Sequence, residues 1–216
     1  MGKTPETLRF YRRNLPHWLV ADATFFVTIR LHGSVPRKVL ADLAEERAEL
    51  KTKRAGSKQW HEYERREFAK IEKILDACGS NAAWLTAPGV AQLVMDNLRW
   101  LENSGWDVFA AVVMSNHAHI LFRNVKGRSA HLLSDLGQFK NFTGRIANRM
   151  IGRKGAFWAR EDFDHWLRSA DKFDSVVQYI AQNPVKAGLV KRWREWPWVY
   201  LKEDMVDIVD EHTAAS

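Results

Sequence analysis

The chain has 216 residues, 46% of them hydrophobic, and contains no run of about 18 uncharged apolar residues that could span a membrane. This length and composition indicate one domain with its own core, expected over residues 1–200. Lys and Arg number 33 against 26 Asp and Glu, and the resulting charge of +7 favours a polyanionic partner. The single cysteine, Cys78, excludes an internal disulfide, and the charged N-terminal segment lacks the apolar core of a signal peptide, so we expect a cytoplasmic protein.

The first predicted strand is ATFFVTIRLHG, residues 23–33, which is rich in β-branched and aromatic residues. Beyond it, three stretches have apolar residues at helical spacing: residues 36–54, 59–78 and 88–103. We therefore expect a charged, helical insertion after the first strand, over about residues 34–104.

Two further strands are predicted at residues 105–114 and 117–124, joined by a two-residue polar connection that is typical of a β-hairpin. A helix is expected next, at residues 129–150, with apolar residues on one side and Lys and Arg on an exposed face. Residues 127–154 hold six Lys or Arg and one acidic residue, Asp135. This helix is therefore the most basic element of the predicted fold.

The following segments are a glycine-broken basic loop, residues 152–158, and a short extended piece, residues 161–168. A last helix is predicted to begin near Ser169, a suitable N-cap residue. We expect it to end by Asn183, because the residue before a proline is disfavoured in helical conformation and Pro184 follows.

The C-terminal part divides into a tryptophan-rich segment and an acidic end. The segment WREWPWVY, residues 193–200, is expected to pack back on the sheet. Acidic side chains cluster in residues 201–216, which predicts a flexible, solvated tail.

His117 and His119 lie in the second strand of the predicted hairpin, within the run VVMSNHAHIL. Side chains two residues apart on a strand point to the same side, so both imidazoles face one way while Ala118 and Ile120 face the other. They could converge on one metal ion, or they could be half-buried sheet residues that bond to the backbone. Two histidines at this spacing leave both interpretations open.

Tyr179 and Asn183 lie one turn apart on the last helix, so their side chains leave the same flank. They could supply a nucleophile and an oxygen ligand to one site. Alternatively, the tyrosine keeps only its hydroxyl in water and the asparagine stabilises the helix end before the proline.

Three motifs in this order resemble the REP-associated tyrosine transposases, relatives of the single-tyrosine HUH transposases. They are VVMSNHAHILF, GAFWAREDFDHWLR and YIAQNPVKAGLV followed by WPW, and the resemblance covers about residues 9–200. It implies an α+β fold, a ferredoxin-like antiparallel sheet with helices packed on it. The sequence departs from the family at Ser115, commonly proline, at Ala118, commonly a larger hydrophobic residue, and after the second Trp of WPW.

The resemblance implies a role for each of four residues. His117 and His119 become metal ligands, Asn183 a third ligand, and Tyr179 the nucleophile that forms a 5′-phosphotyrosine bond with single-stranded DNA. The family uses Mg²⁺ or Mn²⁺, whereas ligand rules for two imidazoles favour Zn, Fe, Ni or Cu. We follow the family and give His165 a structural or substrate-positioning role.

DNA contact is expected on the basic helix, on the loop after it and on the N-terminal RFYRR segment. The residues expected to neutralise phosphates are Arg12, Arg13, Lys140, Arg145, Arg149, Arg153, Lys154 and Arg160. Tyr11, Phe157 or Trp158 could stack on unpaired bases. The alternative is a solvated helix face above buried aromatic residues, and for Trp158 we favour the core.

The sequence thus predicts a metal-dependent endonuclease and strand transferase that acts on single-stranded DNA at hairpins of repetitive palindromic elements. We expect it in the cytoplasm, associated with the nucleoid and not with a membrane, as a monomer or homodimer. Two alternatives stay open: a catalytically idle hairpin-binding protein, and a metal-dependent phosphodiesterase in which water attacks.

Overall fold

A computed structural model describes residues 7–12, 16–20, 23–54, 56–77, 82–125, 131–167 and 170–213. Over these ranges, no helix has the length and apolar character needed to cross a membrane. The helices are α1 (Arg37–Thr52), α2 (Ser57–Asp76), α3 (Val90–Asn103), α4 (Leu132–Met150), α5 (Ala170–Lys186) and α6 (Val206–Thr213). Short 3₁₀ helices are η1 (Trp84–Thr86), η3 (Trp193–Glu195) and η4 (Glu203–Met205).

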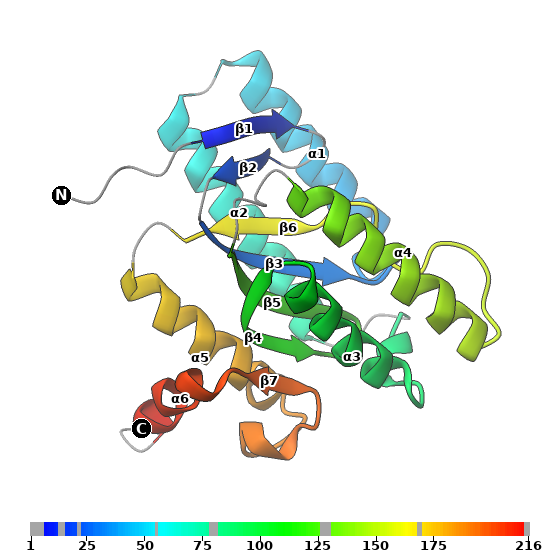
Figure 1. Ribbon diagram of the computed structural model, residues 1–216. Helices are drawn as coiled ribbons and strands as arrows, with labels where there is room; N and C mark the ends of the chain where they lie inside the picture. Colours follow the sequence, from blue (N-terminus) through cyan, green and yellow to red (C-terminus); the bar gives the residue numbers. More distant parts are fainter. Residues whose placement is uncertain are drawn as a thin grey trace.

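The central sheet has five antiparallel strands in the order β6-β3-β5-β4-β7 (Figure 1). The units β3–α3–β4 and β5–α4–β6 each join two strands that have a third between them, which is the ferredoxin-like arrangement that the family resemblance implied. The strands are β3 (Thr24–Arg30), β4 (Trp106–Val113), β5 (His117–Asn124), β6 (Phe163–Trp166) and β7 (Val199–Leu201).

A separate two-stranded hairpin, β1 (Thr7–Arg12) and β2 (Pro16–Val20), precedes the sheet. The strand predicted first is therefore third in the chain. Between β3 and β4 lie α1, α2, η1 and α3, over the span expected to be a helical insertion. Within it, α1 and α2 pack through buried apolar residues, among them Leu43 and Ile71.

One face of the sheet is covered by α3 and α4 (Figure 1). Phe25 and Phe122 of the strands pack there with Phe139 of α4, and all three are buried. The carboxylate of Asp135 on α4 is buried in this layer and accepts a hydrogen bond from Trp106 Nε1 over 2.8 Å. This face thus forms the larger apolar core.

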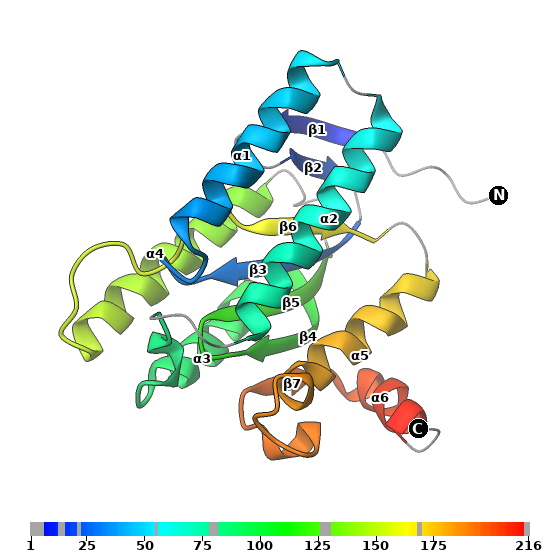
Figure 2. The same ribbon diagram turned by 180° about the vertical axis from the view of Figure 1, so that it is seen from behind.

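The other face is covered by α2 and α5 (Figure 2). Phe26 and Leu121 pack there with Ile180 of α5. Because side chains alternate along β5, His117 and His119 lie on the same side as Leu121. Two imidazoles are therefore enclosed between the sheet and two helices.

The predicted end of the last helix is wrong, because α5 continues through Pro184 to Lys186. Proline lacks an N–H group, so the helix loses one hydrogen bond in its last turns. The helix continues after it, since Ala187 N donates to the carbonyl of Asn183 over 3.0 Å. Ile180 and Asn183 are both fully buried on this helix, and their packing outweighs the conformational preference of a residue before proline.

The prediction of a flexible acidic tail is wrong for residues 203–213, which form η4 and α6. Met205 and Val209 are buried against the core shared with α5, and Ile208 packs beside them. Their spacing places these apolar residues on one side of a short helix. The tryptophan-rich segment packs back on the sheet as predicted, because β7 pairs with β4 and Trp196 Nε1 donates to the Val113 carbonyl.

Candidate active site

The two histidines of β5 meet at their outer nitrogens. Both are fully buried, and the Nε2 atoms of His117 and His119 are 3.0 Å apart. Across β3 they lie opposite Arg30 and Thr28. The structure places the two imidazoles on one side of the strand, as its periodicity predicted, and brings their Nε2 atoms to one point.

Hydrogen bonds fix which nitrogen of each ring carries the proton. Asn116 donates to the carbonyl of Leu75, so its Oδ1 faces His117 Nδ1 at 2.7 Å and accepts a hydrogen bond from it. Thr28 donates to Glu72, so its hydroxyl accepts from His119 Nδ1 over 2.9 Å.

Both Nε2 atoms are thereby left with lone pairs that point at each other. Two neutral lone pairs 3.0 Å apart repel unless a cation or a proton lies between them. Burial lowers the pKa of His117 to about 3, because desolvation, together with the neighbouring His119, outweighs the attraction of Glu72. His117 is therefore neutral at physiological pH, which is the form that ligates metals.

Glu72 of α2 supplies a carboxylate to the same point. Its Oε2 lies 3.2 Å from His119 Nε2, and the ligand atoms of Glu72, His117 and His119 all lie within 4.8 Å of one another. Burial opposes ionisation of Glu72, but its interactions with His119 and His117 and the hydrogen bond from Tyr179 outweigh that effect and lower the pKa of Glu72 to about 2. A buried, ionised carboxylate beside two imidazoles is a donor set that fits a divalent metal ion.

Tyr179 and Asn183 reach this point from α5. The Tyr179 hydroxyl donates to Glu72 Oε2, and its ring centre lies 5.3 Å from that of His119. Asn183 is fully buried with its Nδ2 3.4 Å from His119 Nε2, and its Oδ1 has no hydrogen-bond partner. The amide nitrogen faces His119, so the unpaired oxygen would face the imidazoles only with the amide turned over, an orientation in which it fits a cation.

The nucleophile candidate is protonated at rest. Burial raises the pKa of Tyr179, and the negative charge of Glu72 raises it further. Asp76, one turn after Glu72, lies with Oδ1 4.0 Å from His117 Nε2, and burial together with Glu72 raises its pKa. Lys186 Nζ lies 4.7 Å from the centre of the Tyr179 ring and is the nearest described cation to it on α5.

Glu72 and Asp76 were missed by the sequence analysis, which predicted a charged helical insertion here but no site residues in it. One signal was present: the two acidic residues lie four apart and alternate with the buried Ile71 and Leu75. Acidic groups next to the apolar stripe of an amphipathic helix face the core, where they need a partner. That pattern indicates a buried polar site but does not identify the residues that the two carboxylates contact.

Two predicted DNA-binding residues have structural partners. Lys140 is largely buried, and its Nζ donates to Asp162 over 2.6 Å and to the Arg160 carbonyl over 3.3 Å. The Arg153 guanidinium lies 3.4 Å from the centre of the Trp84 ring and bonds to neighbouring backbone. Both side chains hold local structure.

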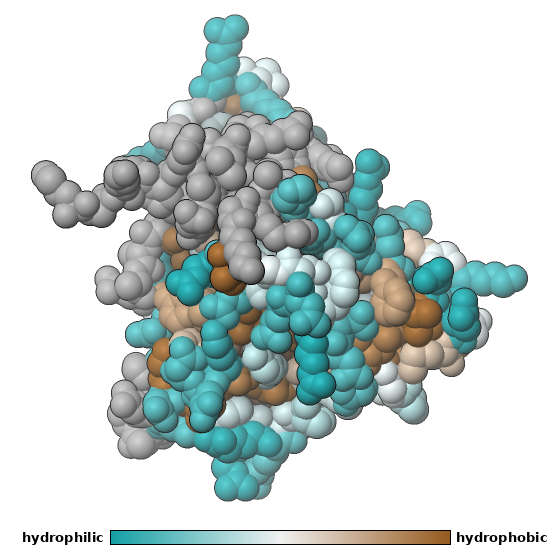
Figure 3. Space-filling model, viewed as in Figure 1, coloured by the Kyte–Doolittle hydropathy of each residue, from teal (hydrophilic) through white to brown (hydrophobic). Residues whose placement is uncertain are grey.

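The remaining predicted phosphate contacts divide by exposure. Arg12 is in β1, and Arg13 lies outside the described residues. Helix α4 lies on the face shown in Figure 3, where hydrophilic residues surround smaller hydrophobic areas. Among the predicted phosphate-contacting residues, Arg145, Arg149, Lys154 and Arg160 are exposed.

Stacking by the aromatic residues of the basic loop is excluded by burial. Phe157 is 3% exposed and Trp158 is 6% exposed, so neither offers a free ring face. Trp158 Nε1 donates to Thr143 over 2.9 Å, which confirms its place in the core. Tyr11 lies in β1 and His165 in β6, opposite Phe26.

Comparisons with known proteins agree with the family resemblance. No family model matches the chain. A curated protein of Haemophilus influenzae that bears the name REP-associated tyrosine transposase is 22% identical over 112 residues, 48% of this chain and 64% of that protein. The match thus spans less than two thirds of that relative.

A solved structure, that of the REP-associated tyrosine transposase bound to a REP hairpin, has a TM-score of 0.51 at 18% identity and covers 88% of this chain and 80% of that one. This likeness shows the fold. The curated relative agrees with the resemblance to REP-associated tyrosine transposases inferred from the sequence motifs, and the solved structure agrees with the fold that this resemblance implies.

Proposed function

We propose that the protein is a metal-dependent DNA endonuclease and strand transferase that cleaves single-stranded DNA beside a hairpin through Tyr179. The observation that carries this proposal is the meeting of the Tyr179 hydroxyl, two Nε2 lone pairs and the Glu72 carboxylate in one buried cluster. A nucleophile beside a metal-ligand set is what a covalent phosphoryl transfer requires.

The proposed ligands of the ion are His117 Nε2, His119 Nε2 and a Glu72 oxygen. Asn183 Oδ1 would be a fourth once its amide, whose nitrogen now faces His119, turns over. Oxygen donors are preferred by Mg²⁺ and Mn²⁺, and a carboxylate and an amide beside two imidazoles support either ion. When bound there, a divalent cation polarises the scissile phosphate and offsets the charge of Glu72 that opposes phenolate formation.

In the proposed reaction, Glu72 orients the Tyr179 hydroxyl through the hydrogen bond that it accepts, and the oxygen of Tyr179 attacks phosphorus in line while its proton passes to solvent. The bond between phosphorus and the 3′ oxygen breaks, and that oxygen leaves as a hydroxyl after taking a proton from solvent. The 5′ end remains on Tyr179 as a phosphotyrosine ester. Because the ester conserves the energy of the phosphodiester, the released 3′ hydroxyl can attack it and reverse the reaction without ATP. A 3′ hydroxyl of another strand can attack in the same way and join that strand to the 5′ end, which frees Tyr179.

The proposed partner is single-stranded DNA with a hairpin, in the cytoplasm and near the nucleoid. The net charge of +7 and the exposed Arg145, Arg149, Lys154 and Arg160 support a phosphate-binding surface. The hairpin is suggested by the structural relative, which is bound to a REP hairpin.

The test is incubation of the protein with an end-labelled hairpin oligonucleotide and Mn²⁺, followed by a denaturing gel. We expect a protein–DNA adduct that survives denaturation and disappears in Tyr179→Phe. Cleavage without an adduct that persists in the variant would instead support the phosphodiesterase. Retention of hairpins with no cleavage in either Mn²⁺ or Mg²⁺ would support the idle binding protein.

A further inference from the structure

A groove of about 530 Å³ lies between α3 and α4, on the opposite side of the sheet from Tyr179. Its size is that of a site for a small organic group. The lining side chains are Asn97, Trp100, Gln138, Phe139, Asn141, Phe142 and Arg145.

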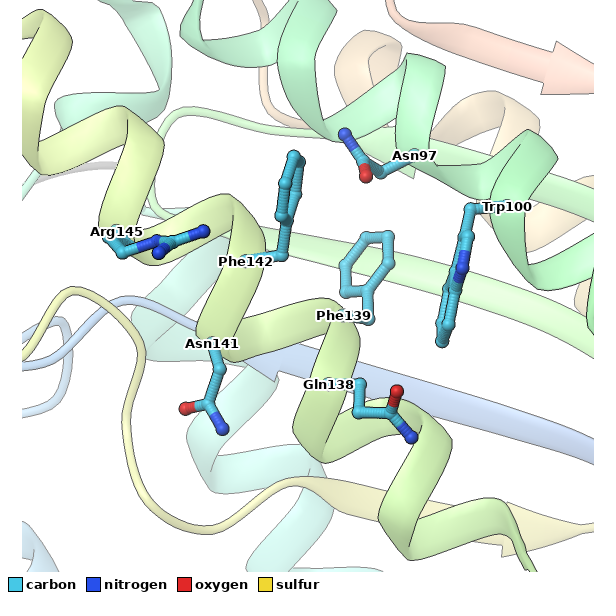
Figure 4. A pocket seen from close by; sticks show the side chains of 7 residues that line it. All are labelled: Asn97, Trp100, Gln138, Phe139, Asn141, Phe142 and Arg145. Atoms are coloured by element: carbon cyan, nitrogen blue, oxygen red, sulfur yellow. The ribbon is translucent and has the colours of Figure 1, made fainter.

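Two aromatic rings in this groove are unusually open to solvent. Trp100 is 36% exposed and Phe142 is 45% exposed, and they are the aromatic members of the exposed large hydrophobic residues in the described part of the chain. Figure 4 shows their rings standing on either side of the Phe139 ring, with Trp100 on α3 and Phe142 on α4. Phe139 is 1% exposed and forms an apolar floor between them.

The edge of the groove is polar and, on α4, basic. Asn97 Nδ2 donates to the Leu93 carbonyl over 2.8 Å, which leaves its amide oxygen free to accept from a ligand. The Arg145 side chain lies beside Phe142 and reaches towards the groove in Figure 4. The acidic residue of α4, Asp135, is buried and bonded to Trp106, so no acid on this helix offsets the exposed arginines.

We propose that this groove holds an unpaired nucleobase of the DNA hairpin, stacked against Trp100 and Phe142 above Phe139. The proposal rests on the proposed function in that the ligand is DNA. Aromatic faces stack on any base, amides bond to its edge, and Arg145 meets the adjoining phosphate.

A second copy of the chain fits this groove less well than DNA. In a two-fold contact the same patch meets itself, which would bring Arg145 and Arg149 of both copies together. Like charges so placed oppose association, whereas a phosphate backbone is attracted.

The position of the groove sets where the base lies relative to the cleavage site. Helix layers on the two faces of a sheet are about 20 Å apart, which corresponds to about six base pairs of duplex at 3.4 Å per pair. The groove therefore anchors the hairpin at a bulge or loop several nucleotides away from the bond that Tyr179 attacks.

The test uses hairpins that carry one 2-aminopurine, a fluorescent base whose emission falls on stacking, at each unpaired position in turn. With wild type we expect quenching at one position, and a Kd that rises at least about tenfold in Trp100→Ala/Phe142→Ala. Trp100→Phe/Phe142→Tyr keeps the rings and should keep the affinity. Leu189→Ala, which removes an exposed apolar side chain outside the groove, should leave both readouts unchanged.

A fully paired duplex of the same length serves as the second ligand, and the double alanine variant should bind it within about twofold of wild type. Equal losses for both ligands, or no loss for either, would overturn the proposal. So would a wild-type dimer in sedimentation that the double alanine variant converts to monomer. The adduct on Tyr179 is scored separately: base-dependent binding without an adduct rejects the proposed function alone, and an adduct with no effect of the groove variants rejects this inference alone.

Discussion

The two faces of the central sheet differ in what they bury. Under α3 and α4, the strands present Phe25 and Phe122 to an apolar core in which the polar Asp135 is paired. Under α2 and α5, the same strands present Thr28, His117 and His119, whose hydrogen bonds converge on acidic and amide groups. One strand, β5, thus supplies packing on one side and chemical groups on the other, because its side chains alternate.

The largest effect should come from the apolar face. Phe122→Ala removes a fully buried ring and is expected to lower the free energy of unfolding by about 3–5 kcal/mol. Tyr179→Phe on the opposite face removes one hydrogen bond to the charged Glu72, costs about 1.5–3 kcal/mol and abolishes the adduct. Urea unfolding and the adduct assay measure both, and a Tyr179→Phe loss as large as that of Phe122→Ala would break the distinction between the faces.

The next effect concerns the metal on the polar face. Glu72→Gln keeps the size of the side chain but removes its charge, and we expect the Mn²⁺ affinity, measured by electron paramagnetic resonance, to fall at least about tenfold. Glu62→Gln is the matched control, an exposed glutamate on the same helix, and should bind Mn²⁺ as wild type does. An unchanged Mn²⁺ affinity in Glu72→Gln, with a loss in Asn183→Ala, would show that the third metal ligand is Asn183 and not Glu72.

A pH effect should distinguish the faces as well. The pKa of His117 is lowered to about 3 in the folded protein, whereas an ordinary histidine in the unfolded chain has a pKa of about 6.5. Between these two pH values His117 is protonated in the unfolded chain and neutral in the folded protein. Stability from this residue is therefore present above pH 6.5 and is lost as pH falls, by about 1.4 kcal/mol per unit between pH 6.5 and 5.

The measurement is urea unfolding of metal-free wild type and His117→Gln across this range. Burial raises the pKa of Glu67 to about 7, so that residue titrates in the same window with the opposite sign. Its contribution cancels in the difference between the two proteins. A difference that does not change with pH would mean that His117 is not held neutral in the fold.

The smallest expected effect is on the salt dependence of DNA binding, and it distinguishes the exposed Arg149 from Lys140, which is bonded to Asp162. Arg149→Ala should reduce the slope of log affinity for hairpin DNA against log salt by about 0.9, because one phosphate contact is lost. Lys140→Ala should leave that slope unchanged, since its ammonium is already bonded to Asp162. Fluorescence titrations at several salt concentrations check both, and a reduced slope in Lys140→Ala would show that the ion pair opens on DNA.

Local periodicity was enough for much of the fold and for half of the candidate site. A period of two placed His117 and His119 on one side of β5, and helical spacing placed Tyr179 and Asn183 on one flank of α5. The same patterns gave the main strands and helices, although Pro184 did not end α5. Local patterns work there because each depends on residues only a few positions apart.

The sequence by itself thus determined which side chains share a face of each element. Only the tertiary structure decided which faces meet: Glu72 bonds to Tyr179 across 107 positions of the chain, and Thr28 to His119 across 91. It also decided that Lys140 is paired with Asp162 and that Trp100 and Phe142 flank one groove. The physical reason is that such contacts depend on how α2, α4 and α5 pack against the sheet, and no local period encodes that packing.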